Sequence, residues 1–457
     1  MATSAPNPVL ASTAAPISRH PGIGREVALA LIALGALAVT FLWWHDTYRV
    51  SGFGDWLTNA GRLTGLWAGY AVIVLLALMA RVPALDRGVG ADRLARWHAM
   101  GGRYTVSLAI AHTLLIVWGY AVTEHRNVVW ETGSLITGYA DVLMATVALG
   151  VLVAVGVTSA RAARRRLRYE TWHFIHLYTY LAIALAFSHQ FATGADFIYN
   201  APARWLWATL YVSVAVLLVW FRVAVPVVGY LRYPMRVAAV QAENADVVSV
   251  YISGRSLADL GAESGQFFRW RFLTRDLWWA ANPYSLSAAP RSDLLRITVK
   301  TAGQHSQALR ALRPGTRVFA EGPYGSMTAA RRRRRKVLLL AGGVGITPLR
   351  ALFESIPGDP GDVTLLYRVR DPADLILREE IDTIARNRGS KVHYLIGPSR
   401  MDHHDHLSAQ RLTRVLPDLR DHDVFLCGPE KMMDNARGAL IQAGVPRRRI
   451  HHESFEF

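Results

Sequence analysis

The sequence predicts a membrane α-helical bundle of six spans, followed by a β-barrel domain and an α/β domain. Two observations carry this prediction. The first half of the chain has windows of about 20 apolar residues, each long enough to cross roughly 30 Å of hydrocarbon. Beyond about residue 232, the pattern changes to short alternating strands, Gly/Pro turns and helices. The apolar windows cover residues 27–44, 62–80, 98–122, 139–158, 172–190 and 203–223.

Composition agrees with a membrane protein and excludes some functions. Of the 457 residues, 52% are hydrophobic, yet the net charge is +17. A single cysteine, Cys427, excludes internal disulfides and any cysteine-ligated iron–sulfur cluster. The basic run RRRRRK at 331–336 directly precedes an apolar strand, and no nucleic-acid module accompanies it, so we expect no nucleic-acid binding.

Basic residues in the connecting loops predict the orientation of the spans. The loop 81–96 carries four arginines and the loop 159–170 is denser still, so both are expected in the cytoplasm. The connections near 45–61, 123–138 and 190–202 carry few Arg or Lys and are expected outside. Six spans place both termini and the second half of the chain in the cytoplasm. We therefore expect a multi-pass protein of the cell (plasma) membrane, with membrane lipid against its basic loops.

The first residues are rich in Ala, Ser and Pro and are predicted to form a disordered cytoplasmic tail. A cleaved signal peptide is the alternative, but the following apolar run is long and has no small-residue cleavage site. The predicted domains are the tail 1–26, the membrane domain 27–225, the β-barrel domain 232–330 and the α/β domain 335–457.

Four histidines in two of the spans are candidate metal ligands. His98 and His112 stand in the third span, and His176 and His189 in the fifth. Fourteen residues of an ideal helix rise about 21 Å and return to within about 40° of the starting face, so the first two project one way at two depths. Thirteen residues turn the second two about 140° apart, which requires a bend, a π-bulge or a different side-chain reach.

Packing of the two spans side by side would make His98 face His176 near the cytoplasm and His112 face His189 near the outer surface. Each pair can hold a planar iron macrocycle from both sides, as axial imidazoles do. Zinc needs four ligands in one tetrahedron, and proton-relay histidines are usually accompanied by intramembrane acids, which these spans almost lack. Two bis-histidine haems are favoured, and packing or proton-path histidines are the alternative. His173, one turn before His176, is expected to face away from the paired histidines.

Six spans with paired histidines, and the letters WHFIH at the start of the fifth, resemble the ferric reductase-like transmembrane domain. That family includes the NADPH oxidases, the ferric-chelate reductases and their bacterial relatives, and the histidine spacings match the NADPH oxidase pattern. The resemblance implies that His98 and His176 ligate an inner haem b, and that His112 and His189 ligate an outer one.

The letters NPYS at 282–285 lie among the predicted short strands of the second half. They are similar to the Arg-x-Tyr-Ser/Thr motif of the ferredoxin–NADP reductase superfamily, which implies an FAD-binding β-barrel. Tyr284 would pack on the flavin ring and the Ser285 hydroxyl would hydrogen-bond flavin N5. Asn282, followed by Pro283, stands where the family has an arginine that grips the FAD pyrophosphate.

The stretch ITVKTAGQHSQAL at 297–309 resembles the phosphate loop of the same superfamily. By this resemblance, Lys300, Gly303 and Ser306 would meet the pyrophosphate at a helix N-terminus. The motif is weak on its own, and the nearby GPYG at 322–325 is also consistent with a simple turn.

The stretch KVLLLAGGVGITPLRALFE at 336–354 runs from an apolar strand into a glycine-rich turn and an amphipathic helix. In this context, glycines let a pyrophosphate approach backbone N–H groups, although strand–helix punctuation alone would give the same letters. The later stretches LLYRVRDPADLILREE and FLCGPEKMMD follow in the order of the superfamily's NAD(P)-binding half. The resemblance implies a pyrophosphate site at Gly342, Gly343, Gly345 and Thr347, and a nicotinamide beside Cys427, Gly428 and Pro429.

Ser285 and Cys427 are the predicted catalytic residues, because the resemblance places them at the reacting rings. For Cys427, a buried small hydrophobe is the alternative. Arg368 and Arg370 follow the second strand of the α/β half, where a 2′-phosphate would sit. Guanidinium groups suit phosphate, so NADPH is favoured over NADH, with a solvated strand end as the alternative.

The chain ends in the letters HHESFEF. In this superfamily a C-terminal aromatic ring stacks over the flavin, where the nicotinamide must displace it. Phe455 is the first candidate for this role and Phe457 the second, and an apolar tail packed on the surface is the alternative.

These features together predict a transmembrane oxidoreductase that passes electrons from cytoplasmic NADPH through FAD and two haems b to an acceptor outside the membrane. Dioxygen, giving superoxide, and ferric chelates are the leading acceptors, and a quinone or protein partner is the third. Alternatives from other classes are a haem-free, membrane-anchored flavin reductase and a transporter. Polar residues expected near the outer end, which would either bind the acceptor or simply face water, are His45, Asp46, Glu124, His125 and Arg126.

Overall fold

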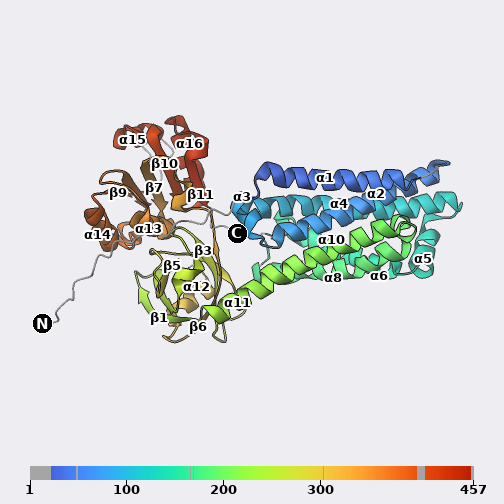
Figure 1. Ribbon diagram of the computed structural model, residues 1–457, viewed down its shortest axis with the longest axis horizontal. Coiled ribbons are helices and arrows are strands. Elements are labelled where there is room, and N and C mark those ends of the chain that lie inside the picture. Colours follow the sequence, from blue (N-terminus) through green and yellow to red (C-terminus); the bar gives the residue numbers. More distant parts are fainter. Residues whose placement is uncertain are drawn as a thin grey trace. The chain divides into compact units, whose positions relative to one another are not determined.

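The structure is a computed structural model of the chain, which divides into two compact units (Figure 1). The first unit ends at Tyr211 and the second begins at Val212. The described residues are 22–47, 50–164, 166–167, 169–301, 303–398 and 407–453. Most of the predicted tail, together with Phe455 and Phe457, lies outside them, and the first helix already begins at Arg25. The predicted domain boundaries stay predictions.

The first unit is built from long helices that run side by side (Figure 1). Among the described residues, five helical segments are long and apolar enough to cross a membrane. They correspond to α1 (Arg25–His45), α2 (Phe53–Met79), α4 (Ala91–Thr123), α6 (Val142–Ser159) and α10 (Ala201–Val219), the last continuing through the π-helical segment η1 (Trp220–Ala224) and α11 (Val225–Arg232). The prediction of several apolar N-terminal helices is thereby confirmed.

The fifth predicted span coincides with α8 (Tyr169–Thr193), which is not among these five segments. Its three histidines and three tyrosines lower its mean hydropathy, so a count of six spans stays a prediction. The connection 123–138, expected as a loop, contains an eleven-residue helix. The short connecting helices are α3 (Pro83–Gly88), α5 (Val128–Gly138), α7 (Arg161–Arg164) and α9 (Ala195–Ile198).

Small residues let α2 and α4 approach each other closely. A Cβ on Gly119 of α4 would lie 2.3 Å from the Thr58 hydroxyl and 2.8 Å from its backbone nitrogen, and a Cβ on Gly61 of α2 would lie 2.9 Å from Ile116. Close backbone approach through small residues is how helices associate where lipid removes the hydrophobic driving force. The opposite faces of the helices expose large apolar side chains, such as Leu37 and Phe41 of α1, as expected of surfaces in contact with lipid.

The second unit begins with a six-stranded antiparallel sheet in the order β4-β3-β6-β1-β2-β5. An isolated bridge between Leu286 and Ile297 joins its two edges, but one bridge is not a continuous ladder, so a closed barrel stays a prediction. The inward side chains of β3, including Phe268 and Trp270, are fully buried. The strands are β1 (Met235–Ala242), β2 (Val247–Gly254), β3 (Phe267–Phe272), β4 (Asn282–Ser285), β5 (Leu294–Lys300) and β6 (Arg317–Tyr324).

A five-stranded parallel sheet in the order β11-β10-β7-β8-β9 follows. Alternate residues of its central strand enter two different cores: Leu339 packs with α13 and α14, and Leu340 packs with α15 and α16. Helices therefore cover both faces, as a parallel sheet requires. The elements are β7 (Lys336–Gly342), α13 (Ile346–Ser355), β8 (Val363–Val369), α14 (Arg378–Arg388), β9 (Lys391–Ile396), α15 (Ala409–Val415), β10 (His422–Cys427), α16 (Glu430–Gln442) and β11 (Ile450–Glu453).

The turn between β7 and α13 gives a prediction about backbone packing. A Cβ on Gly345 would lie 2.4 Å from the carbonyl oxygen of Cys427, which is backbone and cannot move aside easily. Gly345→Ala should therefore lower the free energy of unfolding of the second unit by about 1–3 kcal/mol. Gly438 in α16 has open space around it, so Gly438→Ala should be neutral or stabilise by about 0.5–1 kcal/mol. Thermal unfolding of the full chain in detergent tests both, and equal melting of the two variants would contradict the packing argument.

Candidate functional site

The four predicted histidines form two facing pairs between α4 and α8. The ring centres of His98 and His176 are 5.9 Å apart, and those of His112 and His189 are 6.1 Å apart. Two metal–imidazole bonds of about 2.0 Å on opposite sides of one metal ion place the ring centres roughly 6 Å apart. The spacing of both pairs therefore fits an ion held between two imidazoles.

Hydrogen bonds at Nδ1 orient these rings. Nδ1 of His112 lies 2.8 Å from the Gly61 carbonyl oxygen and Nδ1 of His98 lies 3.2 Å from the Leu75 carbonyl oxygen. A carbonyl only accepts, so Nδ1 donates in both cases and the lone pair of the neutral ring is on Nε2. Metal-bound histidines usually make this second hydrogen bond with the nitrogen that does not bind the metal.

The same arrangement holds on α8. Nδ1 of His189 lies 2.9 Å from Thr193 Oγ1, and that hydroxyl donates its own proton to the His189 carbonyl, so Nδ1 is the donor. Nδ1 of His176 lies 3.5 Å from Ser159 Oγ on α6, and that oxygen accepts a hydrogen bond from Trp172 Nε1 at 3.1 Å. The Trp172 ring stacks on His176 with a centroid distance of 5.2 Å.

The 13-residue spacing on α8 needs no π-bulge, because α8 is one uninterrupted α-helix from Tyr169 to Thr193. The Nδ1 partners of its two histidines differ: one is on α6, and the other is one turn further along α8. The two side chains therefore leave the helix in different directions and still meet the two rings on α4. The sequence left three explanations for the 13-residue spacing: a bend, a π-bulge or a different side-chain reach. These contacts agree best with a different side-chain reach.

Within the described residues, no three His, Cys, Asp or Glu side chains gather as a metal site would need them. A haem requires only two protein ligands, because the porphyrin supplies the other four. The donor set of two facing imidazoles at each level therefore suits a haem, whereas a four-ligand zinc site would need more residues.

Two glycines of α2 make room for the outer pair, and neither is among the residues predicted from the sequence. Gly61 provides the carbonyl that holds His112, and a Cβ on Gly65 would lie 2.5 Å from His112 Nδ1. Their G-x-x-x-G spacing in an apolar stretch is a recognisable sign of close helix packing, so the sequence did contain this information.

An ion pair beside Gly61 was also missed. Arg62 Nη2 lies 2.5 Å from Asp196 Oδ1, and Arg62 Nη1 donates to Asn59 Oδ1 at 2.9 Å. The Asp196 side chain is buried, so α9 is tied to α2 close to the outer imidazole pair. Because 134 residues separate the two partners, no local pattern could have revealed the pair.

The polar residues expected near the outer end are partly engaged within the protein. Asp46 bonds to His45 at 2.8 Å and to the Asn200 side chain at 2.9 Å. Arg126 lies 3.6 Å from Glu131 and stacks over the Trp130 ring. Glu124 and His125 are exposed. Asp46 and Arg126 therefore have partners within the protein. A role of these residues in binding an acceptor stays a prediction.

In the second unit, the letters NPYS form strand β4, which pairs with β3. Trp270 Nε1 donates to the Tyr284 carbonyl at 2.9 Å, and burial raises the pKa of the Tyr284 phenol to about 12. The Ser285 side chain is only 5% exposed, and its hydroxyl has no hydrogen-bond partner among the described residues. An unpartnered buried hydroxyl costs free energy, so a ligand atom such as flavin N5 would satisfy it.

The predicted phosphate loop has a local structure of its own. Lys300 ends β5 and is exposed, and Gly303 caps the five-residue helix α12 (Gln304–Ala308). The Gly303 N–H donates to Ser306 Oγ at 3.0 Å, and the same hydroxyl donates to the Gly303 carbonyl. Ser306 therefore serves as a helix cap here, and its contact with a pyrophosphate stays a prediction.

The glycine-rich turn lies at the carboxyl ends of β7 and β10. A Cβ on Gly428 would lie 3.1 Å from the Gly342 Cα, and Gly345 packs on the Cys427 carbonyl, so both act through close backbone packing. Gly343 has a left-handed φ of +53° and open space around it. The Thr347 hydroxyl donates to the Val344 carbonyl at 3.0 Å. The carboxyl ends of parallel strands are where nucleotides bind in such folds.

The residues predicted around the nicotinamide and the 2′-phosphate differ in exposure. Cys427 is 0% exposed within a hydrophobic core, and burial raises the pKa of its thiol. Arg368 is a buried residue of β8 rather than one that follows the strand, whereas Arg370 follows it and is exposed. The burial of Cys427 agrees with the alternative in which it is only a small hydrophobic core residue. The binding roles of Cys427, Arg368 and Arg370 stay predictions.

Comparison with protein families gives matches to three parts of the chain. The ferric reductase like transmembrane component matches residues 64–187, the FAD-binding domain matches 232–328 and the oxidoreductase NAD-binding domain matches 339–438. The first range contains His98, His112 and His176, and ends two residues before His189.

The chain belongs to the ferric reductase-like transmembrane family, with a dehydrogenase region of the ferredoxin–NADP reductase type. It is a membrane oxidoreductase that has flavin-binding and nicotinamide-nucleotide-binding domains.

Curated relatives match the dehydrogenase region of this ferric reductase-like protein. Ferredoxin–NADP reductase B of Sorangium cellulosum is 31% identical over 194 residues, which cover 38% of this chain and 77% of the relative. The reductase component of a 3-ketosteroid-9-alpha-monooxygenase of Rhodococcus rhodochrous is 31% identical over 48% of this chain and 64% of the relative. The corresponding component from Mycobacterium tuberculosis is 30% identical, and the chain spans only 54% of its length.

Two of the solved structures that match the chain have low TM-scores. A ferredoxin NADP+ reductase from Neisseria gonorrhoeae has a TM-score of 0.41 and 18% identity, covering 49% of this chain and 98% of that structure. A flavohemoglobin from Malassezia yamatoensis has a TM-score of 0.44 and 17% identity, covering 95% and 100%. At these TM-scores the likeness supports no statement about the function of this protein.

The buried thiol gives a prediction that uses the single cysteine of this ferric reductase-like protein. Burial raises the pKa of Cys427 and blocks reagent access, so the thiol should not react with a disulfide reagent at pH 8 in the native protein. After unfolding in denaturant, one thiol per chain should react. Rapid reaction of the native protein would show that Cys427 reaches solvent at the carboxyl edge of the sheet.

Proposed function

We propose that this protein carries electrons from NADPH, through FAD and two bis-histidine haems b, across the cell membrane to dioxygen or a ferric chelate. The observation that carries the proposal is the pair of facing imidazoles at two levels, with ring centres 5.9 and 6.1 Å apart. The chemistry supplied by the bound groups is hydride uptake at the flavin and one-electron transfer at the haem irons.

The chain's own residues would bind and orient these groups. His98 and His176 would hold the inner haem, and His112 and His189 the outer one, each with Nδ1 fixed by a hydrogen bond. Two imidazoles would hold each haem, and the bound haems would supply one-electron transfer toward the final acceptor.

The dehydrogenase residues have the corresponding roles. The buried, unpartnered hydroxyl of Ser285 would donate to flavin N5, beside the Tyr284 ring. The turn at Gly343, with open space around it, would admit the pyrophosphate of the nicotinamide nucleotide. Exposed Arg370 favours NADPH, because its guanidinium suits a 2′-phosphate, and NADH is the alternative.

The direction of transfer follows from the distribution of basic loops. Arginines gather in 81–96 and 159–170, so these connections and the dehydrogenase region would face the cytoplasm and the acceptor would bind outside. The two proposed acceptors are small molecules. A quinone or a protein partner is the alternative acceptor.

Removal of one ligand tests the haem assignment. His112→Ala should remove roughly half of the haem and leave reduction of the flavin by NADPH intact, because the flavin is in the other unit. His173→Ala is the matched control, since His173 is exposed on the same helix as His176 and both haems should remain. The measurement is the spectrum of the dithionite-reduced protein, with haem and FAD content per chain. Wild-type protein without low-spin b-type bands would contradict the proposal and favour a haem-free flavin reductase or a transporter.

The acceptor is tested in vesicles supplied with NADPH on the dehydrogenase side. Superoxide and ferrous iron should be measured in the same preparation, with and without superoxide dismutase. Iron reduction that persists with dismutase indicates direct transfer to the chelate, and iron reduction that disappears is secondary to superoxide. If neither product forms while the haems are reduced, a quinone or a protein partner is the acceptor and the proposal of dioxygen or a ferric chelate is wrong.

A further inference from the structure

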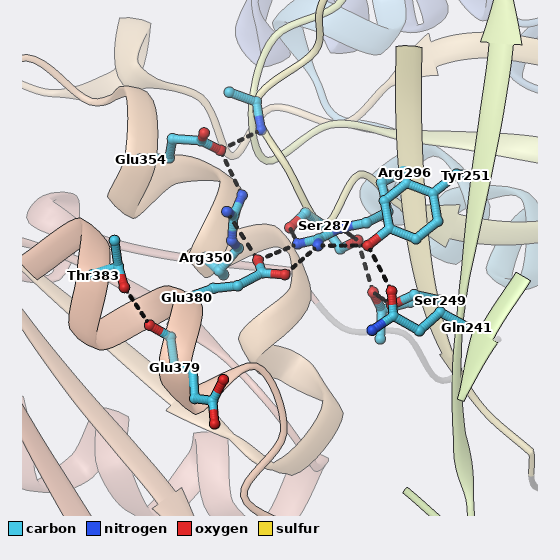
Figure 2. Close-up of polar contacts among 12 residues, drawn as sticks. Gln241, Ser249, Tyr251, Ser287, Arg296, Arg350, Glu354, Glu379, Glu380 and Thr383 are labelled. Carbon is cyan, nitrogen blue, oxygen red and sulfur yellow. Dashed lines mark hydrogen bonds and ion pairs between the residues drawn. The ribbon is translucent and has the colours of Figure 1, made fainter. Parts of the chain in front are cut away.

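A cluster of two arginines and two glutamates joins the two sheets of the second unit (Figure 2). Arg296 comes from β5 of the antiparallel sheet. Arg350 and Glu354 are on α13 and Glu380 is on α14, both of which cover the parallel sheet. The cluster is therefore a polar contact between the flavin-binding and nucleotide-binding halves of the dehydrogenase.

Glu380 is at the centre of the cluster. Its carboxylate accepts two bonds from Arg296, Nη1 to Oε1 at 2.7 Å and Nη2 to Oε2 at 2.9 Å, which is a bidentate pair. Arg350 Nη2 lies 3.0 Å from the same Oε2. The two arginine side chains are 5% and 8% exposed, so this one carboxylate contacts two buried cations from different halves.

Arg296 extends this contact to the strand that carries the predicted flavin residues. Its Nη2 donates to the Ser287 carbonyl at 2.8 Å and its Nε donates to Ser287 Oγ at 3.1 Å. Ser287 is fully buried, only two residues beyond Ser285. Thr298 Oγ1 also donates to Ser287 Oγ, at 2.8 Å, so the segment after β4 is fixed at several points.

Arg350 and Glu354 extend the contact to the helix after the glycine-rich turn. Arg350 is three residues beyond Thr347 and forms an ion pair with Glu354 one turn later. Glu354 in turn accepts the Ala289 N–H at 2.9 Å, just beyond Ser287. The helix that would hold the nucleotide pyrophosphate is therefore attached to the strand end that would hold the flavin.

Glu380 keeps its charge in this setting. Burial by itself would raise the pKa of Glu380, but the hydrogen bonds and positive charges of Arg296 and Arg350 outweigh it and hold that pKa below its usual value. The carboxylate therefore stays ionised at neutral pH, and the two arginines keep an anionic partner.

We propose that Glu380 is a positioning residue for hydride transfer, which holds the strand end at Ser285 against the helix that follows the glycine-rich turn. The inference rests on the proposed function, because it needs a nicotinamide and a flavin bound on the two sides of this contact. A hydride would move from the nicotinamide ring to flavin N5 only with the two atoms in near contact, and a displacement of about 1 Å can slow such a step roughly 100-fold. Loss of Glu380 should therefore slow the chemical step more than it weakens the binding of either nucleotide.

The test compares Glu380→Gln with Glu379→Gln in the full chain. Both glutamates are in the first turn of α14, so both changes remove one negative charge from the same helix end. Figure 2 shows the Glu379 carboxylate pointing away from the cluster, and this side chain is exposed. Glu379→Gln is thus a matched control for charge and position.

The measurement is stopped-flow reduction of the bound flavin over a range of NADPH concentrations, with FAD content and thermal unfolding of each variant. Glu380→Gln should lower the limiting rate roughly 10- to 100-fold with little change in the apparent Kd for NADPH and with FAD retained. Glu379→Gln should match wild type. Glu380→Asp, which keeps the charge, should recover much of the rate, and provides the comparison if the glutamine variant is unstable.

A limiting rate for Glu380→Gln within about twofold of wild type would overturn the inference. So would a loss of rate that only follows loss of FAD or unfolding, because the role would then be purely structural. Wild-type protein that NADPH does not reduce, although FAD is bound, would overturn the proposed function itself, and the two failures are distinguishable.

Discussion

The pairing of imidazoles across α4 and α8 is the constraint on which the helical unit depends. Each pair needs two rings to face each other inside an apolar bundle, and a ring is held in place only if its second nitrogen has a partner. Carbonyl groups of α2 provide that partner for both histidines of α4, and Ser159 of α6 and Thr193 of α8 provide it for the others. The contacts that orient the rings therefore also join α2 to α4 and α6 to α8.

This constraint explains why α2 has glycine at positions 61 and 65. A carbonyl can reach an imidazole on the next helix only where the two backbones approach closely, and a side chain at Gly65 would occupy the place of the His112 ring. The buried Arg62–Asp196 pair then connects α9 to this part of α2. Both the packing and the hydrogen bonding of His112 therefore depend on one short segment of α2.

The dehydrogenase half has a different problem, because two nucleotides must bind on two sheets and still meet. Shared hydrophobic packing supplies part of the connection: Val247 and Met327 are buried in the same core as β7 and α13. Hydrophobic contacts are not directional, whereas a bidentate carboxylate–guanidinium pair restricts angle as well as distance. The cluster around Glu380 therefore adds the directional component that positioning of two rings requires.

The sequence by itself determined the apolar helices, the strand–turn–helix of the nucleotide-binding half and the identity of all four histidines. These features are local, since they depend on hydrophobic periodicity, glycine positions and spacing along one helix. Only the tertiary structure decided which carbonyl groups bond to the histidines. It also decided how two histidines 13 residues apart on α8 reach two histidines 14 residues apart on α4. The pairing of Arg296 with Glu380, 84 residues away, was likewise decided only there. Such contacts join residues far apart in the chain, and their geometry depends on packing that no local pattern encodes.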